Sequence, residues 1–103
     1  MIDLHIENDT AEIVLNNPQA RNALAEADLK DLSAAYTEAE VRGVRALILR
    51  GEGKGFCAGR NIRGVVPAED DATDYLANKV TPVLKQMSNF PAPTFAAVQG
   101  ACL

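Results

Sequence analysis

Residues 51–62, Gly-Glu-Gly-Lys-Gly-Phe-Cys-Ala-Gly-Arg-Asn-Ile, form a glycine-rich stretch directly after the apolar run Ala-Leu-Ile-Leu at 46–49. This sequence predicts a strand that runs into a loop. Four glycines within nine residues let the backbone adopt positive φ or approach a ligand closely, so main-chain N–H groups can donate to an anion. The G-x-G-x-x-G fingerprint would need glycine at Phe56, and the Walker pattern would need it at Ile48. A loop that holds an anion or oxyanion is therefore predicted, and a nucleotide loop is the poorer fit.

The composition is that of one globular domain. The chain has 103 residues, of which 48% are hydrophobic and 23% charged, so it can bury a modest core and is too apolar for a disordered chain. No apolar run approaches the length that spans a membrane. The first residues lack the basic and apolar regions of a secretion signal, so a cytoplasmic location is expected.

The charge balance is acidic. A net charge of −4 and a sequence pI of about 4.8 disfavour a nucleic-acid surface, because phosphate backbones are bound by an excess of Lys and Arg. Four basic residues could still form a local anion-binding patch around the glycine loop, or could be ordinary solvated charges. These residues are Arg21, Lys54, Arg60 and Arg63.

The two cysteines, Cys57 and Cys102, are too few for a disulfide scaffold and have no C-x-x-C spacing. Both are expected to be small buried thiols, and no metal site is expected. The single histidine, His5, lies on the polar side of an alternating stretch and is expected at the surface.

The order of the patterns predicts an α/β chain. Apolar and polar residues alternate in 2–7, and a second apolar stretch in 11–15 completes a β-hairpin. An amphipathic helix is predicted from Asn22 to about Arg42, followed by a strand at 44–49. These elements form a βαβ unit, whose crossover should be right-handed.

The second half of the chain continues the alternation of helix and strand. Gly64–Asp74 contains a proline and an acidic run, which indicates a surface segment that would suit an ordering lid. A helix is predicted at Thr73–Ser88, with Pro82 as an irregularity that kinks or divides it. A further strand is predicted at Thr94–Val98.

Three stretches resemble the signatures of one known family, the enoyl-CoA hydratase/isomerase or crotonase superfamily. They are residues 17–24 (Asn-Pro-Gln-Ala-Arg-Asn-Ala-Leu), residues 47–62 with the glycine loop, and residues 91–103 (Pro-Ala-Pro-Thr-Phe-Ala-Ala-Val-Gln-Gly-Ala-Cys-Leu). All three follow in the family's order, and together they extend over the whole chain.

The resemblance implies the N-terminal portion of a crotonase-like spiral of ββα units, with hairpin, helix, strand, helix and strand in that order. It implies an enzyme that hydrates or isomerises the enoyl double bond of an acyl-CoA thioester. The acyl-CoA is then the substrate, no cofactor or metal is implied, and a homo-oligomer, trimer or hexamer, is the implied assembly.

The resemblance also assigns roles to residues. The backbone N–H of Arg60 would be the first of two donors to the thioester oxygen, and its side chain would matter less. The residues implied in coenzyme A binding are Arg21, Ala23, Ala58, Arg60, Asn61, Ile62 and Arg63. For Arg21 and Arg63 the alternative of plain surface charge stays open.

The sequence departs from the family in two places. Asn61 stands where the family commonly has Asp, which changes a loop hydrogen bond without touching the implied donor. Residues 1–103 resemble the N-terminal part of a single domain, and this part ends before the second donor and the acid/base residues of the family. The resemblance therefore gives no residue of this chain the acid/base role. The acidic residues of the chain are expected to be ordinary surface carboxylates: Glu52, Glu69, Asp70, Asp71 and Asp74.

Two function classes therefore remain. The first is an enoyl-CoA hydratase or isomerase of which this chain is the N-terminal part. The second is a non-catalytic half-domain that binds coenzyme A or a partner subunit without turnover of its own.

Overall fold

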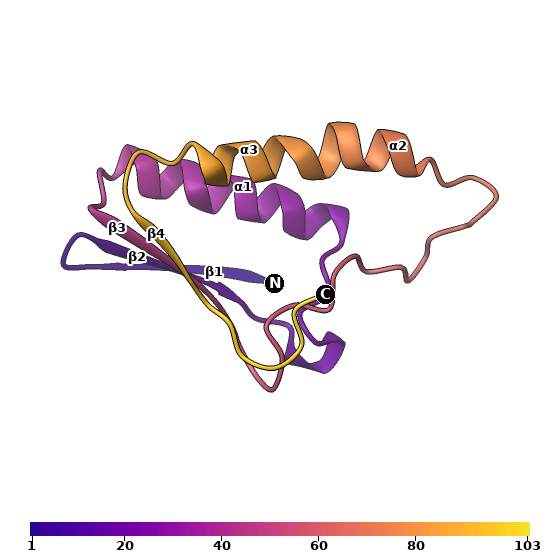
Figure 1. Cartoon of the computed structure of the whole chain (residues 1–103), viewed down its shortest axis with the longest axis horizontal. Coiled ribbons are helices and arrows are strands. Elements are labelled where there is room, and N and C mark those ends of the chain that lie inside the picture. The colour runs from indigo at the N-terminus through magenta and orange to yellow at the C-terminus, as the bar shows by residue number, and fades with distance from the viewer.

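The computed structural model describes residues 1–103 and shows a four-stranded sheet with helices on one face (Figure 1). The strands lie in the order β1 (Ile2–Glu7), β2 (Thr10–Leu15), β3 (Ala46–Gly51) and β4 (Thr94–Ala97). β1 and β2 pair antiparallel, while β2–β3 and β3–β4 are parallel. The predicted hairpin, βαβ unit and last strand are confirmed.

The hairpin turns at Asn8 and Asp9, which both have positive φ, 51° and 64°. Two consecutive left-handed residues are typical of the type I′ turn, whose twist matches that of the flanking strands. Asn and Asp tolerate this conformation better than most residues because their short polar side chains can hydrogen-bond locally.

The helical layer has one long helix and one composite helix. α1 (Glu26–Val41) follows a short 3-10 turn, η1 (Pro18–Ala20). α1 begins four residues later than the predicted start at Asn22, because Asn22 has a left-handed φ of 59° and Leu24 pairs with Arg60 in a β-bridge. The α-helical conformation can therefore begin only after Leu24.

The composite helix consists of α2 (Ala72–Asp74), the wider π-helical η2 (Tyr75–Val80) and α3 (Thr81–Ser88). Figure 1 shows it as one continuous rod beside α1. The predicted irregularity near Pro82 is confirmed as a change of winding: the Thr81 N–H donates to Leu76 O, five residues back. Pro82 lies in the first turn of α3, directly after the π-helical turn, so its missing N–H falls where the winding changes.

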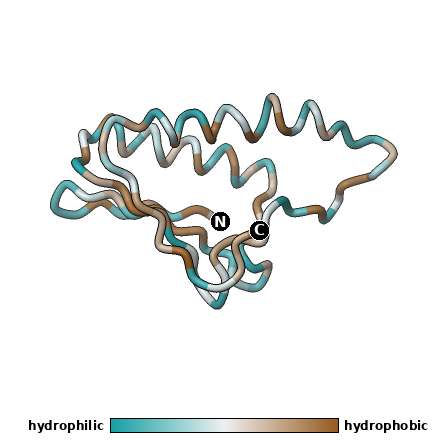
Figure 2. Tube along the Cα trace, in the orientation of Figure 1, coloured by the Kyte–Doolittle hydropathy of each residue, from teal (hydrophilic) through white to brown (hydrophobic).

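The core lies between the sheet and the two helices. Ala11, Ile13 and Leu47 of the central strands are fully buried under α1. Tyr36 of α1 meets Phe90 edge to face, with ring centroids 5.8 Å apart, and its burial raises its pKa to about 12. Figure 2 shows the apolar strands in brown and the polar hairpin turn in teal.

The cysteine prediction is half right. Cys57 is buried, whereas Cys102 is exposed, because the end of the chain pairs with the glycine loop at the surface. His5 is exposed, as predicted.

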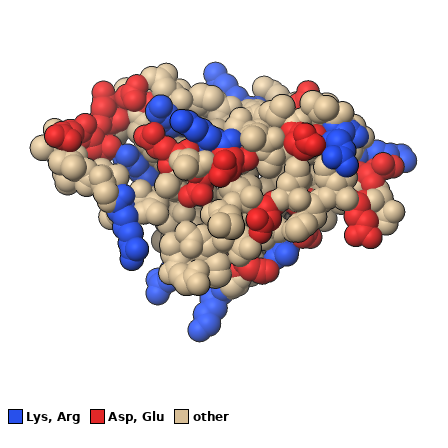
Figure 3. Space-filling model, turned by 180° about the vertical axis from the view of Figure 1, so that it is seen from behind, with Lys and Arg blue, Asp and Glu red and all other residues tan.

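The molecule is flat, with principal extents of 47 × 28 × 16 Å, as expected of two layers. Seen from behind, acidic and basic side chains are interspersed (Figure 3). The ion pairs of the chain include Arg42–Glu38 and Arg50–Glu12. No helix of the chain is both long enough and apolar enough to cross a membrane.

Candidate functional site

The side chain of Asn22 joins the segment at residues 17–22 to the glycine loop at residues 51–62. This residue was not identified from the sequence. Its side chain is 1% exposed and donates from Nδ2 to the carbonyl oxygens of Glu52, Gly55 and Phe56, at 2.9, 3.1 and 3.1 Å. Its Oδ1 accepts from the Asn17 N–H at 2.8 Å. A carboxamide can both donate and accept, so this one side chain satisfies both loops. The available signal was a polar residue in the first of the three family-like stretches.

The glycine loop follows β3 and is also held by the end of the chain. The N–H groups of Phe56 and Cys57 donate to Ala101 O, and the Leu103 N–H donates to Cys57 O at 2.9 Å. The approach is close enough that a Cβ on Gly100, whose φ is +59°, would lie 2.2 Å from Lys54 O. Glycine at position 100 is therefore required by contact as well as by φ.

The backbone of Arg60 is paired on one side only. Leu24 donates to Gly59 O at 2.8 Å and accepts from the Asn61 N–H at 2.8 Å, which makes a parallel bridge between Leu24 and Arg60. In such a bridge the N–H and C=O of Arg60 itself point away from Leu24. The Arg60 N–H donates to no atom of the chain, so it is free to donate to a ligand oxygen.

The side chain of Arg60 has a separate and well-defined position. Its guanidinium binds the Asp70 carboxylate through two hydrogen bonds, Nη1–Oδ2 at 3.0 Å and Nη2–Oδ1 at 2.8 Å. The guanidinium carbon also lies 3.8 Å from the ring centroid of Tyr75. The hydrogen bonds to Asp70 raise the pKa of Arg60, and the same bonds lower the pKa of the Asp70 carboxyl.

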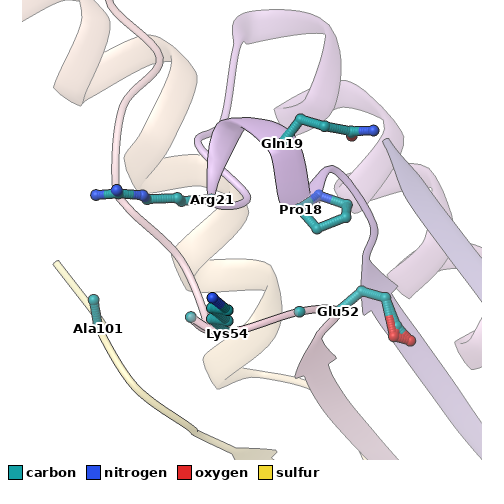
Figure 4. Close-up of a pocket in the computed structure, with 8 residues that line it drawn as sticks. Pro18, Gln19, Arg21, Glu52, Lys54 and Ala101 are labelled. Carbon is teal, nitrogen blue, oxygen red and sulfur yellow. The ribbon is translucent and has the colours of Figure 1, made fainter.

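Two hollows open beside the glycine loop, and Arg21 lines both. The first, here called the Lys54 hollow, has a volume of about 570 Å³ and lies between η1 and the turn after β3. Figure 4 shows Arg21, Lys54 and Ala101 around its open centre, while the Glu52 carboxylate points away. Its lining residues are Pro18, Gln19, Arg21, Glu52, Gly53, Lys54, Gly55 and Ala101.

The second, here called the Arg60 hollow, has a volume of about 480 Å³. It brings six of the seven residues implied by the resemblance together. Its lining residues are Asn17, Gln19, Ala20, Arg21, Ala23, Arg60, Asn61, Ile62 and Arg63. The seventh residue, Ala58, lines neither hollow, and its N–H instead donates to Arg21 O at 2.9 Å. Arg60 is paired with Asp70, but Arg21 and Arg63 form no ion pair, and with no carboxylate on the wall they make this hollow suited to an anionic ligand.

None of the chain's carboxylates lines the Arg60 hollow. Glu52 pairs with Arg50 at 3.1 Å, and Asp71 caps α2 by accepting from the Asp74 N–H. Asp70 is more than the ordinary surface carboxylate that was predicted, because it binds Arg60 in a bidentate pair. No group of three His, Cys, Asp or Glu residues could hold a metal ion.

Comparison with known proteins shows the family of the chain. A model of the enoyl-CoA hydratase/isomerase family matches residues 5–103. The chain belongs to the enoyl-CoA hydratase/isomerase family. The resemblance found in the three stretches is thus confirmed.

Relatives within the family are similar over almost the whole chain. A probable enoyl-CoA hydratase of Bacillus subtilis is 33% identical over an alignment of 104 positions, which covers 99% of this chain and 40% of the relative. Methylglutaconyl-CoA hydratase of Mus musculus, a mitochondrial protein, is 32% identical over 96% of this chain and 33% of the relative. The chain therefore spans about two fifths or less of these relatives' length.

Solved structures of the family have the same fold over these residues. The crystal structure of a probable enoyl-CoA hydratase from Mycobacterium smegmatis matches with a TM-score of 0.87 and 35% identity, over 98% of this chain and 41% of that one. The α/β fold predicted as the N-terminal portion of the crotonase spiral is confirmed by this match.

Proposed function

We propose that the chain binds acyl-CoA thioesters and supplies one of the backbone donors to the thioester oxygen in an enoyl-CoA hydratase or isomerase. The observation that carries the proposal is the unpartnered N–H of Arg60 on the wall of a cationic hollow. When water adds to an enoyl thioester, or when a proton is moved, negative charge develops on the carbonyl oxygen. A fixed N–H stabilises that charge without reorganisation, by about 3–4 kcal/mol per donor.

In this proposal the remaining residues hold the coenzyme A part. Arg21 and Arg63 face its phosphates as cations, because phosphate groups are best bound by charge-assisted donors. Ala23, Asn61 and Ile62 line the path of the pantetheine arm, and small or uncharged side chains leave room for it. Ala58 contributes through its backbone bond to Arg21 O, which holds the two loops at a fixed separation.

A non-catalytic role is the second candidate for these 103 residues. The wall of the Arg60 hollow contains no Asp, Glu or His, so it offers no group that moves a proton at neutral pH. Residues 1–103 would then bind and polarise the thioester but not turn it over. A homo-oligomer is proposed from the family resemblance alone.

The test replaces the Arg60 amide by an ester, which deletes the N–H and leaves the side chain in place. Cys57 makes this possible, because a synthetic 57–103 segment can be ligated to a 1–56 thioester at that cysteine. Binding of crotonyl-CoA and of free coenzyme A is measured by calorimetry for both chains. Free coenzyme A lacks the acyl carbonyl and is the matched control ligand.

The ester should weaken crotonyl-CoA binding by about 3- to 10-fold, the value of one hydrogen bond, and leave coenzyme A binding unchanged. Arg63→Gln should weaken both ligands alike, because phosphates are common to them. An ester that lowers the two affinities equally would overturn the assignment of the donor. If neither crotonyl-CoA nor coenzyme A bound the unmodified chain, the whole proposal would be overturned.

A further inference from the structure

Residues 62–70, here called the strap, connect the glycine loop to α2. Figure 1 shows this segment running out to the far end of the helical layer and back. Its own hydrogen bonds are local: Arg63 N–H to Asn61 Oδ1, Val65 N–H to Ile62 O, and Glu69 N–H to Val66 O. None of these bonds holds the strap to the body of the molecule.

Packing does not hold the strap either. Its large apolar side chains Ile62 and Val66 are 73% and 51% exposed. A cavity of about 190 Å³ separates its residues 63–65 from Leu24, Glu26 and Tyr75. A segment with so few buried contacts has little stability of its own.

One interaction does tie the strap down, and it starts from the candidate donor. The Arg60–Asp70 pair is the only hydrogen-bonded contact between residues 62–70 and any residue outside 61–70. It closes the strap into a loop that begins at Arg60, and the same guanidinium packs on Tyr75. The backbone of Arg60 is thus held by Leu24, and its guanidinium is held by Asp70.

We propose that Asp70 is a positioning residue of the acyl-CoA site: through the Arg60 guanidinium it holds the strap beside the Arg60 hollow and fixes the direction of the Arg60 N–H. This inference rests on the proposed function, because the N–H matters only if a thioester oxygen accepts from it. It adds to that function a role for the Arg60 side chain, which the family resemblance ranked below its main chain.

The test compares Asp70→Asn with Glu69→Gln in the 103-residue chain. Both changes remove one negative charge from the strap, but the Glu69 side chain makes no hydrogen bond or ion pair. Two quantities are measured: the rate of trypsin cleavage at Arg63–Gly64, and the ratio of crotonyl-CoA affinity to coenzyme A affinity. The first reports the order of the strap, and the second reports the contribution of the acyl carbonyl.

Asp70→Asn should speed cleavage at Arg63 several-fold and lower the affinity ratio toward that of the Arg60 ester. Glu69→Gln should change neither, and Asp70→Glu should restore part of both. Unchanged cleavage in Asp70→Asn would overturn the anchoring role, and an unchanged affinity ratio would overturn the positioning role. If the Arg60 ester itself left the ratio unchanged, the proposed function would fail, while the cleavage rates would still decide the anchoring.

Discussion

At the scale of single residues, Asn22 is the side chain on which the site depends most. Replacing it by Ala removes this donor from the buried carbonyl of Phe56 and from the partly buried carbonyls of Glu52 and Gly55. We expect Asn22→Ala to lower the free energy of unfolding by about 2–4 kcal/mol, because buried unsatisfied groups are costly. Urea denaturation followed by circular dichroism measures this loss.

The control for Asn22→Ala is Asn8→Ala. Both residues have left-handed φ, 59° and 51°, but Asn8 is exposed in the hairpin turn. Asn8→Ala should cost only the conformational penalty, about 1 kcal/mol. Equal losses for the two variants would mean that the side-chain bonds of Asn22 contribute nothing beyond its φ.

Asp70 should make part of the stability depend on pH. The hydrogen bonds from Arg60 lower the pKa of its carboxyl below the ordinary value of 3.8. Its contribution is therefore fully present above that ordinary value and is lost as the pH falls through the lowered pKa. The difference in melting temperature between the wild type and Asp70→Asn should shrink between neutral pH and about pH 2. A difference that stayed constant over this range would contradict the ion pair as its source.

At the scale of elements, the turn at residues 99–103 and the glycine loop are held together by glycine contacts. A Cβ on Gly100 would lie 2.2 Å from Lys54 O, a distance that forces the two loops apart. We expect Gly100→Ala to cost about 2–4 kcal/mol in unfolding free energy. Thermal denaturation gives the value.

Gly43→Ala is the matched comparison for Gly100→Ala. Gly43 also has positive φ, +66°, but an added Cβ there meets nothing within 4 Å. That substitution should cost about 1 kcal/mol, the penalty of the left-handed backbone alone. If Gly100→Ala were no worse than Gly43→Ala, the close approach of the loops would not be needed for stability.

At the scale of the whole molecule, the edge of the sheet is the surface most exposed to association. All four residues of β4 are exposed, and Phe95 and Val98 keep 59% and 54% of their surface accessible. Exposed apolar edge strands pair with other chains unless something covers them. We expect the 103-residue chain to self-associate at micromolar concentration and to bind a hydrophobic dye.

Phe95→Lys should reduce this association, because a charge on an edge strand opposes pairing. Ile62→Lys is the control, since Ile62 is 73% exposed on the strap, away from β4. Light scattering and sedimentation would show the difference. A strictly monomeric wild type, or equal effects of the two lysines, would count against β4 as the contact.

The elements of this chain were encoded by short-range patterns and could be predicted from the sequence. Alternation in 2–7, helical periodicity in α1 and the glycine cluster each act over a few neighbouring residues, so their backbone preferences are visible in the sequence. The family-like stretches also named six of the residues that line the Arg60 hollow. These signals are local, and so the hairpin, βαβ unit, composite helix and last strand were all anticipated.

Only the tertiary structure decided the contacts between residues that lie far apart in the chain. Asn22 reaches Phe56 across 34 positions, and its left-handed backbone delays α1 to Glu26. Asp70 was predicted to be a surface acid, but folding brings it onto Arg60. Cys102 was predicted to be a buried thiol, but its isolated bridge with Cys57 leaves it exposed. No local preference encodes such pairings, because each depends on where a second segment lies once the core has packed.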